Sequence, residues 1–139
     1  MKYYTKTAKE TLVLAKKFAK ELKGGETIGL IGNLGAGKTI FTKGIAIKLG
    51  IEKNITSPTF VLMKIYPVNS QKQIKFLVHI DAYRIKSAND LIAIGANEHF
   101  DQPDTVTIIE WADKIKKILP KKTKFIKITI NGVCRQILF

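Results

Sequence analysis

Apolar residues in the first third of the chain recur with the spacing of amphipathic helices and buried strands. Positions three or four apart predict a helix over residues 7–22, which the glycine pair at 24–25 ends. A second helix is predicted from Lys38 to Leu49, where Gly50 follows. Between the two helices, the run Thr27–Ile31 is typical of a short buried strand. The first fifty residues therefore predict a helix, a strand and a helix in that order.

The rest of the chain predicts mainly strands separated by polar turns. Runs of apolar and β-branched residues predict strands at 60–66, 74–80, 106–109, 124–130 and 133–139. Short helices are predicted at 87–95 and 111–119, the first capped by Ser87 and the second stopped by Pro120. Asn131-Gly132 joins the last two strands and is typical of a hairpin with a type I′ turn.

A glycine-rich motif follows the first predicted strand. Residues 32–39, GNLGAGKT, match G-x-x-x-x-G-K-[ST] between an apolar strand and an amphipathic helix. Glycines let the backbone curl around a phosphate, and the helix N-terminus adds partial positive charge. Lys38 is expected to reach the β- and γ-phosphates, and the Thr39 hydroxyl to ligate Mg²⁺. With the order of elements, this motif predicts one α/β domain over residues 1–139, a three-layer P-loop NTPase-like fold with a mixed β-sheet.

Two acidic residues follow apolar strands and are candidates for binding Mg²⁺ or for orienting the attacking water. Asp81 follows the run 76–80, and Glu110 follows 106–109. Both predicted strands should end at the same edge of the sheet as the phosphate loop, where a carboxylate can hold Mg²⁺ or orient water. Spacing alone leaves open which acid touches the metal and which positions the water.

Charge and composition narrow the choice of function. The net charge is +13, but 22 of the 24 basic residues are Lys and Ile occurs 21 times, a bias that codon usage also produces. The segment 76–113 carries a net charge of −5 between segments of +10 and +8, and it contains both candidate acids. This pattern favours a nucleoside triphosphate with Mg²⁺ as the ligand, rather than a polyanion bound diffusely over the surface. The lone Cys134 excludes an intrachain disulfide, and no apolar run is long enough for a transmembrane helix, so a cytoplasmic protein is expected.

Four motifs together resemble one family. GNLGAGKT at 32–39, SPTF at 57–60, HIDAYR at 79–84 and IEWADK at 109–114 are similar in order and spacing to the bacterial TsaE (YjeE) family. The resemblance implies a small Mg²⁺-dependent ATPase required for the threonylcarbamoyladenosine modification next to the tRNA anticodon. Its hydrolysis of ATP would reset or regulate the TsaD–TsaB transferase, and the protein would interact with tRNA only indirectly, through that complex.

The resemblance also implies roles for individual residues. Thr39 and Glu110 would be Mg²⁺ ligands, and Asp81 would be the second essential acid. Ser57 and Thr59 would lie in a switch-like loop that senses the γ-phosphate. The expected catalytic residues are Lys38, Asp81 and Glu110. The expected metal-site residues are Thr39, Glu110 and Asp81. Those expected at the nucleotide are Thr7, Asn33, Leu34, Gly35, Ala36, Gly37, Lys38, Thr39, Ile40, Ser57, Thr59, Trp111 and Arg135.

Two other function classes fit parts of the sequence. A small-molecule P-loop kinase would need an acceptor pocket and an arginine-rich lid, but the chain has only Arg84 and Arg135. A basic nucleic-acid-binding module would show RNA affinity that falls steeply with salt. Of the remaining residues, His79 is expected to pack or to hydrogen-bond rather than bind metal, and Cys134 to be a core thiol.

Overall fold

The computed structural model describes residues 1–58, 60–69 and 73–139. Within them, a sheet runs in the order β1-β7-β6-β2-β5-β4-β3. Its strands are β1 (Lys2–Thr5), β2 (Thr27–Ile31), β3 (Met63–Pro67), β4 (Phe76–Asp81), β5 (Thr105–Glu110), β6 (Lys124–Asn131) and β7 (Cys134–Leu138). The helices are α1 (Ala8–Ala19), α2 (Lys38–Lys48), α3 (Ala88–Ala93) and the 3₁₀ helices η1 (Ala96–His99) and η2 (Ala112–Ile118). None of the described helices is long and apolar enough to cross a membrane.

The middle of the sheet is parallel and its edges are antiparallel. Strand β2 pairs in parallel with both β5 and β6, and β5 pairs in parallel with β4. Strands β3, β7 and β1 run antiparallel to their neighbours β4, β6 and β7. The predicted mixed sheet is therefore confirmed. In the register of β4 and β5, Asp81 lies opposite Glu110, while Leu30 near the end of β2 also lies opposite Glu110.

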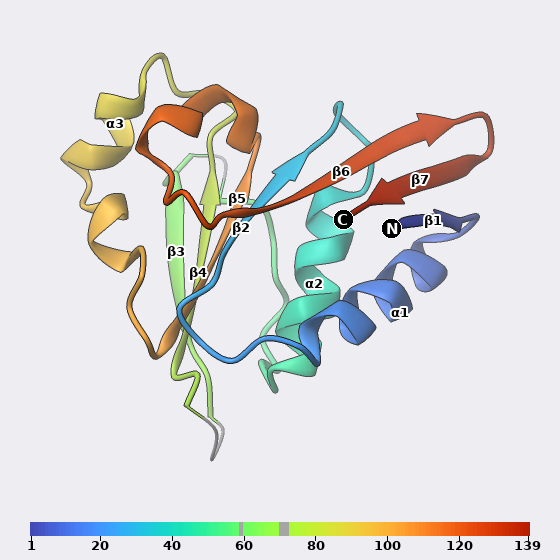
Figure 1. Ribbon diagram of the computed structural model, residues 1–139, viewed down its shortest axis with the longest axis horizontal. Helices are drawn as coiled ribbons and strands as arrows, with labels where there is room; N and C mark the ends of the chain where they lie inside the picture. The colour runs from blue at the N-terminus through green and yellow to red at the C-terminus, as the bar shows by residue number, and fades with distance from the viewer. Residues whose placement is uncertain (59, 70–72) are drawn as a thin grey trace.

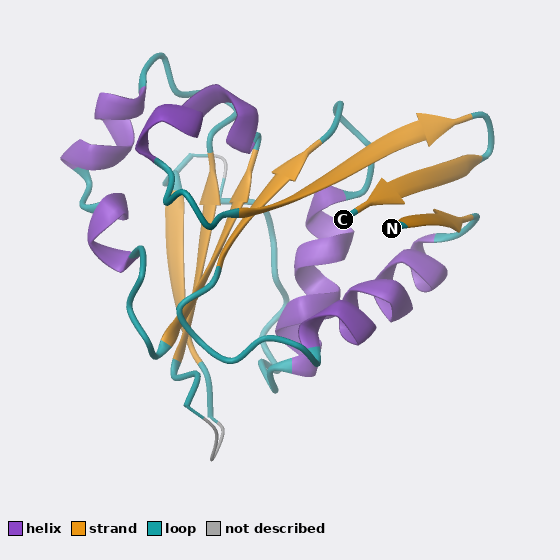
Figure 2. Ribbon diagram, in the orientation of Figure 1, coloured by secondary structure: helices purple, strands orange, loops and turns teal. Residues whose placement is uncertain are grey.

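Helices cover both faces of the sheet. Figures 1 and 2 show α1 and α2 on one face, and α3, η1 and η2 on the other. A large apolar cluster between the sheet and the first pair includes Leu30, Phe41 and Ile108, and a smaller one on the opposite face includes Ile80 and Ile109. This arrangement confirms the predicted three-layer α/β fold.

Strand β3 begins later than the sequence predicts. The apolar run from Phe60 makes a turn first, in which Leu62 N–H donates to the Pro58 carbonyl at 2.8 Å and Leu62 has a φ of 63°. Phe60 and Val61 are 86% and 60% exposed, so their apolar side chains do not line a buried strand. The strand prediction for 60–66 was therefore wrong over its first three residues, because the run is apolar without being buried.

The helix prediction for 111–119 also needs correction. Trp111 has a φ of 60° and precedes the helix as its N-cap, and residues 112–118 form a 3₁₀ helix rather than an α-helix. Ile115 departs from helical geometry, with a φ of −129°, so this segment is kinked. The left-handed turn at Trp111 redirects the chain at the end of β5, which an amphipathic pattern cannot reveal.

The ends of the chain hold further differences. The hairpin turn consists of Gly132 and Val133, because Asn131 pairs with Cys134. Only Gly132 of these two has a positive φ, 61°, which fits a type II′ rather than the predicted type I′ turn. The predicted core thiol, Cys134, is only partly buried. Strand β1 and helix η1 were not predicted, because four-residue elements show too little periodicity.

Candidate active site

The phosphate loop joins β2 to α2 and fits closely against the sheet. A Cβ built on Gly32 would lie 2.4 Å from the Ile128 carbonyl oxygen of β6, so only glycine allows this approach. Gly35 has a φ of 77°, in the left-handed region that glycine adopts without strain. Helix α2 begins after Gly37, and this N-cap glycine has no side chain with which to cap the first N–H groups. The loop therefore presents an uncapped helix N-terminus, which favours an anion.

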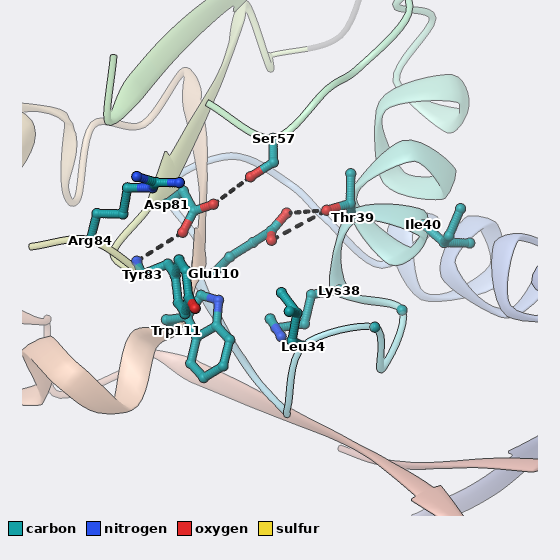
Figure 3. Close-up of a pocket in the computed structure, with 12 residues that line it drawn as sticks. Leu34, Lys38, Thr39, Ile40, Ser57, Asp81, Tyr83, Arg84, Glu110 and Trp111 are labelled. Carbon is teal, nitrogen blue, oxygen red and sulfur yellow. Dashed lines mark hydrogen bonds between the residues drawn. The ribbon is translucent and has the colours of Figure 1, made fainter. Parts of the chain in front are cut away.

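A cavity of about 580 Å³ opens in front of this loop. Figure 3 shows side chains reaching it from the phosphate loop, from the start of α2 and from the ends of β4 and β5. Its lining comprises Leu34, Gly35, Gly37, Lys38, Thr39, Ile40, Ser57, Asp81, Tyr83, Arg84, Glu110 and Trp111. The structure thus brings both candidate acids and the phosphate loop to one place.

Glu110 lies at the centre of a short hydrogen-bond network. The Thr39 hydroxyl lies 3.0 Å from Glu110 Oε1 and 3.3 Å from Oε2, and donates to this carboxylate. His79 Nε2 lies 2.9 Å from Glu110 Oε1. Glu110 and His79 are 3% and 0% exposed, so these bonds form away from bulk water. The prediction that His79 packs or hydrogen-bonds is confirmed.

Asp81 is held by a different set of donors. The Ser57 hydroxyl donates to Asp81 Oδ2, and the backbone N–H of Tyr83 donates to Oδ1 at 2.9 Å. Asp81 is 5% exposed. Because Ser57 lies in the segment before β3, Asp81 links that segment to the end of β4. The two neighbouring acids therefore have distinct partners, Thr39 for one and Ser57 for the other.

The ammonium group of Lys38 is folded back onto its own loop. It donates to the carbonyls of Gly32 at 2.5 Å and Asn33 at 2.9 Å, and lies 4.1 Å from the centre of the Trp111 ring. Burial lowers its pKa below the ordinary lysine value of 10.5, an effect that the nearby carboxylates of Glu110, Asp81 and Asp113 oppose. A buried ammonium is poorly hydrated, which strengthens its attraction for an arriving phosphate.

Aromatic side chains form one wall of the cavity. The rings of Tyr83 and Trp111 lie 5.0 Å apart, tilted by 37°. Lys114 Nζ lies 5.2 Å from the Tyr83 ring and 5.6 Å from the Trp111 ring, and donates to the Tyr83 carbonyl. The left-handed conformation of Trp111 thus places its ring against Lys38 and Tyr83, close to the phosphate loop.

A second cavity of about 340 Å³ lies on another side of the same loop. Thr7, the N-cap of α1, lines it, and so does Arg135 of β7, whose Nη2 lies 3.5 Å from the Gly35 carbonyl oxygen. Gly35, Gly37 and Ile40 line both cavities. Residues from the two ends of the chain therefore meet at the phosphate loop.

Most of the sequence-predicted site residues gather at these two cavities. Ala36 lines the second cavity but not the first, and Asn33 reaches the site through its carbonyl, which accepts from Lys38. Thr59 lies outside the described residues. Sequence reasoning gave no site role to Tyr83, although it stands two residues after Asp81 and its N–H bonds that carboxylate. Arg84 also lines the main cavity, and two signals pointed to it: its place in the HIDAYR motif and the scarcity of arginine in a lysine-rich chain.

The oxygen donors at the loop suit a hard divalent cation. Among the described residues, no group of three His, Cys, Asp or Glu side chains forms a metal cage. Mg²⁺ does not need one, because it is usually bound by one or two protein oxygens together with phosphates and water. The Thr39 hydroxyl and the Glu110 carboxylate, in contact at the helix N-terminus, fit that requirement.

Comparison with known proteins identifies relatives over most of the chain. The model of the family "TsaE: Threonylcarbamoyl adenosine biosynthesis protein TsaE" matches residues 5–137. The TsaE protein of Treponema pallidum is 35% identical over 130 residues, 94% of this chain and 92% of that protein. The TsaE protein of Rickettsia prowazekii is 42% identical over 113 residues, 80% of this chain and 74% of that protein. The crystal structure of YdiB from Bacillus subtilis superposes with a TM-score of 0.79 at 34% identity, covering 99% of this chain and 82% of that one.

Proposed function

The chain belongs to the TsaE family of threonylcarbamoyl adenosine biosynthesis proteins, and we propose that it serves this tRNA modification as a Mg²⁺-dependent ATPase. The observation that carries the proposal is the contact of the Thr39 hydroxyl with the Glu110 carboxylate beside an uncapped helix N-terminus. Phosphoryl transfer needs mainly positioning and charge neutralisation, and this edge of the sheet offers residues for both.

The polyphosphate of ATP is assigned to the main cavity. Lys38 exchanges its bonds to the Gly32 and Asn33 carbonyls for bonds to the phosphate oxygens. The first backbone N–H groups of α2 donate to the same anion. Lys38 can make this exchange by rotating its side chain, since its carbonyl partners belong to the loop that encloses the phosphates.

Glu110 and Thr39 are assigned to the metal, and Asp81 to the attacking water. The Thr39 hydroxyl touches both Glu110 oxygens, whereas Asp81 is bonded to Ser57 and to the Tyr83 N–H. When bound, Mg²⁺ supplies neutralisation of the charge that develops on the β- and γ-phosphate oxygens. Asp81 lies on the neighbouring strand, opposite Glu110, and can accept a hydrogen bond from water in the same cavity.

The nucleoside is assigned to the second cavity. Thr7 and Arg135 line it, and the loop residues that it shares with the main cavity connect the two spaces. The planar guanidinium of Arg135 can stack on a base or bind a phosphate with two hydrogen bonds, which an ammonium cannot do. This arrangement lets one nucleotide lie across the phosphate loop.

The proposed partner is the TsaD–TsaB transferase, whose cycle ATP hydrolysis would reset or regulate. Ser57 joins Asp81 to the segment that leads to the exposed Phe60 and Val61. Leu34, at 74% exposure, lies on the phosphate loop itself. A change at the γ-phosphate can therefore alter an apolar surface beside the cavity, which is how nucleotide switches change affinity for a partner.

The test is phosphate release by the full chain with and without TsaD–TsaB and tRNA. Release should require Mg²⁺ and increase when the transferase is present. Lys38→Ala should abolish release, while Lys48→Ala should not, because Lys48 is an exposed residue at the other end of the same helix. Absence of orthophosphate release under all conditions would refute the ATPase assignment, and release unaffected by TsaD–TsaB would refute the assigned partner. A phosphorylated small molecule as the product would favour the kinase alternative.

A further inference from the structure

The proposed mechanism leaves one buried polar residue of the site without a role. His79 lies on β4, two residues before Asp81, so both side chains are on the same face of the sheet. It is 0% exposed, and its Nε2 lies 2.9 Å from Glu110 Oε1. In the β4–β5 register His79 lies opposite Ile108, two residues before Glu110. The imidazole therefore reaches diagonally along the sheet to the carboxylate that the proposed function assigns to the metal.

The contacts of the ring define which of its nitrogens is the hydrogen-bond donor. A carboxylate oxygen accepts hydrogen bonds, so Nε2 must carry the proton that it donates to Glu110. Nδ1 is buried and has no hydrogen-bond partner among the described residues. A proton on Nδ1 would give a buried donor with no acceptor, which is costly. His79 therefore donates to Glu110 through Nε2.

We propose that His79 is a positioning residue that holds Glu110 for the metal. The inference rests on the proposed function, since it assumes that Glu110 binds Mg²⁺. His79 bonds Oε1 and is itself shielded from solvent, so it restrains the carboxylate without competing for the phosphate or the nucleoside. Donors of this kind orient metal ligands, and their loss typically lowers metal affinity by about 10–100-fold. His79 thus sets the Mg²⁺ affinity of the site and not its affinity for metal-free ATP.

Three substitutions separate this role from simple packing. In His79→Gln, the amide nitrogen is three bonds from Cβ, as Nε2 is in histidine, so it can still donate to Glu110. In His79→Asn, the amide nitrogen is two bonds from Cβ, as Nδ1 is, and falls short of the carboxylate. His79→Leu fills the space without a donor. Gln and Asn carry the same chemical group, so they form a matched pair that differs in reach.

The readout is ATP binding by the full chain, followed through the fluorescence of Trp111. This is the only tryptophan of the sequence and it lines the cavity. In His79→Asn and His79→Leu, the Mg²⁺ concentration at half-saturation should rise by about 10–100-fold, and in His79→Gln by less than about threefold. Affinity for ATP in excess EDTA should change by less than about threefold in all three, because the donor acts through Glu110.

Several results would overturn the proposal. One is an unchanged Mg²⁺ half-saturation in folded His79→Asn and His79→Leu proteins. Another is a loss of EDTA-resistant ATP binding in all three variants, Gln included, which would make the residue merely structural. Imidazole ¹⁵N spectra of the metal-free protein give an independent check, and an Nε2 without a hydrogen would contradict the donation to Glu110. If the unaltered chain binds ATP with no dependence on Mg²⁺, the metal assignment itself fails and this inference falls with it, a result that the wild-type titration shows alone.

Discussion

The close approach of the phosphate loop to β6 makes Gly32→Ala the most demanding test of the site's geometry. The added Cβ would lie 2.4 Å from the Ile128 carbonyl oxygen, whereas ordinary contacts begin at 3.4 Å. Either the loop or β6 must therefore move by about 1 Å, and β6 is held between β2 and β7 by backbone hydrogen bonds. Overpacking of this kind costs about 1–3 kcal/mol.

The expected effect on stability follows from the size of the chain. An unfolding entropy of about 2.1 cal/mol/K per residue gives about 0.3 kcal/mol/K for this protein, so Tm should fall by about 3–10 °C. Calorimetry or circular dichroism of the nucleotide-free protein measures this shift. A Tm within about 1 °C of wild type would show that the loop does not lie against β6 as described.

Gly35→Ala is the matched control, because this glycine is required for a different reason. No described atom lies within 4 Å of a Cβ added there, but the φ of 77° is unfavourable for alanine. The backbone strain of an alanine at this φ costs about 1–2 kcal/mol. Without a ligand the loop can relax and release this strain, so Tm should change little. ATP binding requires the strained shape, so ATP affinity should fall by about 5–30-fold. Equal losses of Tm in both variants would contradict the distinction.

Three further predictions concern charge at the site. Glu110→Gln should raise the Mg²⁺ half-saturation of ATP binding more than Asp81→Asn does, and the reverse order would exchange the roles of the two acids. The pKa of Lys38, followed by ¹³C NMR of its side chain, should lie below the ordinary 10.5 because of burial and should rise when ADP binds. In the nucleotide-free protein, burial of the charged ammonium opposes folding. This penalty decreases as pH increases through the folded pKa, since the unfolded chain then binds more protons than the folded one. A value at or above 10.5 in the free protein would disprove this account of its burial. Arg135 lines the cavity assigned to the nucleoside, so Arg135→Ala should weaken ATP binding by about 5-fold, as expected for the loss of one hydrogen bond to the ligand, and leave inorganic triphosphate binding unchanged. Equal losses of affinity for ATP and for triphosphate would show that Arg135 binds the phosphates and not the nucleoside.

The sequence predicts most reliably those parts of the site that are contiguous in the chain. Strand β2 has the predicted bounds, and α2 begins at the predicted residue, because glycines and the apolar run mark both ends of the loop. The convergence of Asp81 and Glu110 also follows from sequence, since both end parallel strands of the same sheet. These features depend on local pattern and on the general geometry of α/β folds.

Features that depend on long-range packing were not predicted. Strand β1 forms only because β7 offers it an edge, with Thr5 opposite Arg135. The left-handed φ of Trp111 opposes the preference of a bulky residue and is maintained by tertiary contacts. The spacing of His79 and Asp81 does show that they share a face of the strand, but the bond from His79 to Glu110 depends on the register of β4 with β5.

The central place of β2 in the sheet also affects how the protein folds during its synthesis on the ribosome. The strand that leads into the phosphate loop is synthesised early, yet both of its neighbours come late: Thr27 pairs with Thr107, and Ile28 with Lys124. Until those residues have been made, β2 is an apolar segment with two unsatisfied edges. Pairings over such sequence separations are slow to form, and an unpaired apolar edge favours aggregation. The site proposed for the nucleotide therefore cannot form before β5 and β6 have left the ribosome, and until then β2 presents unpaired edges that favour aggregation.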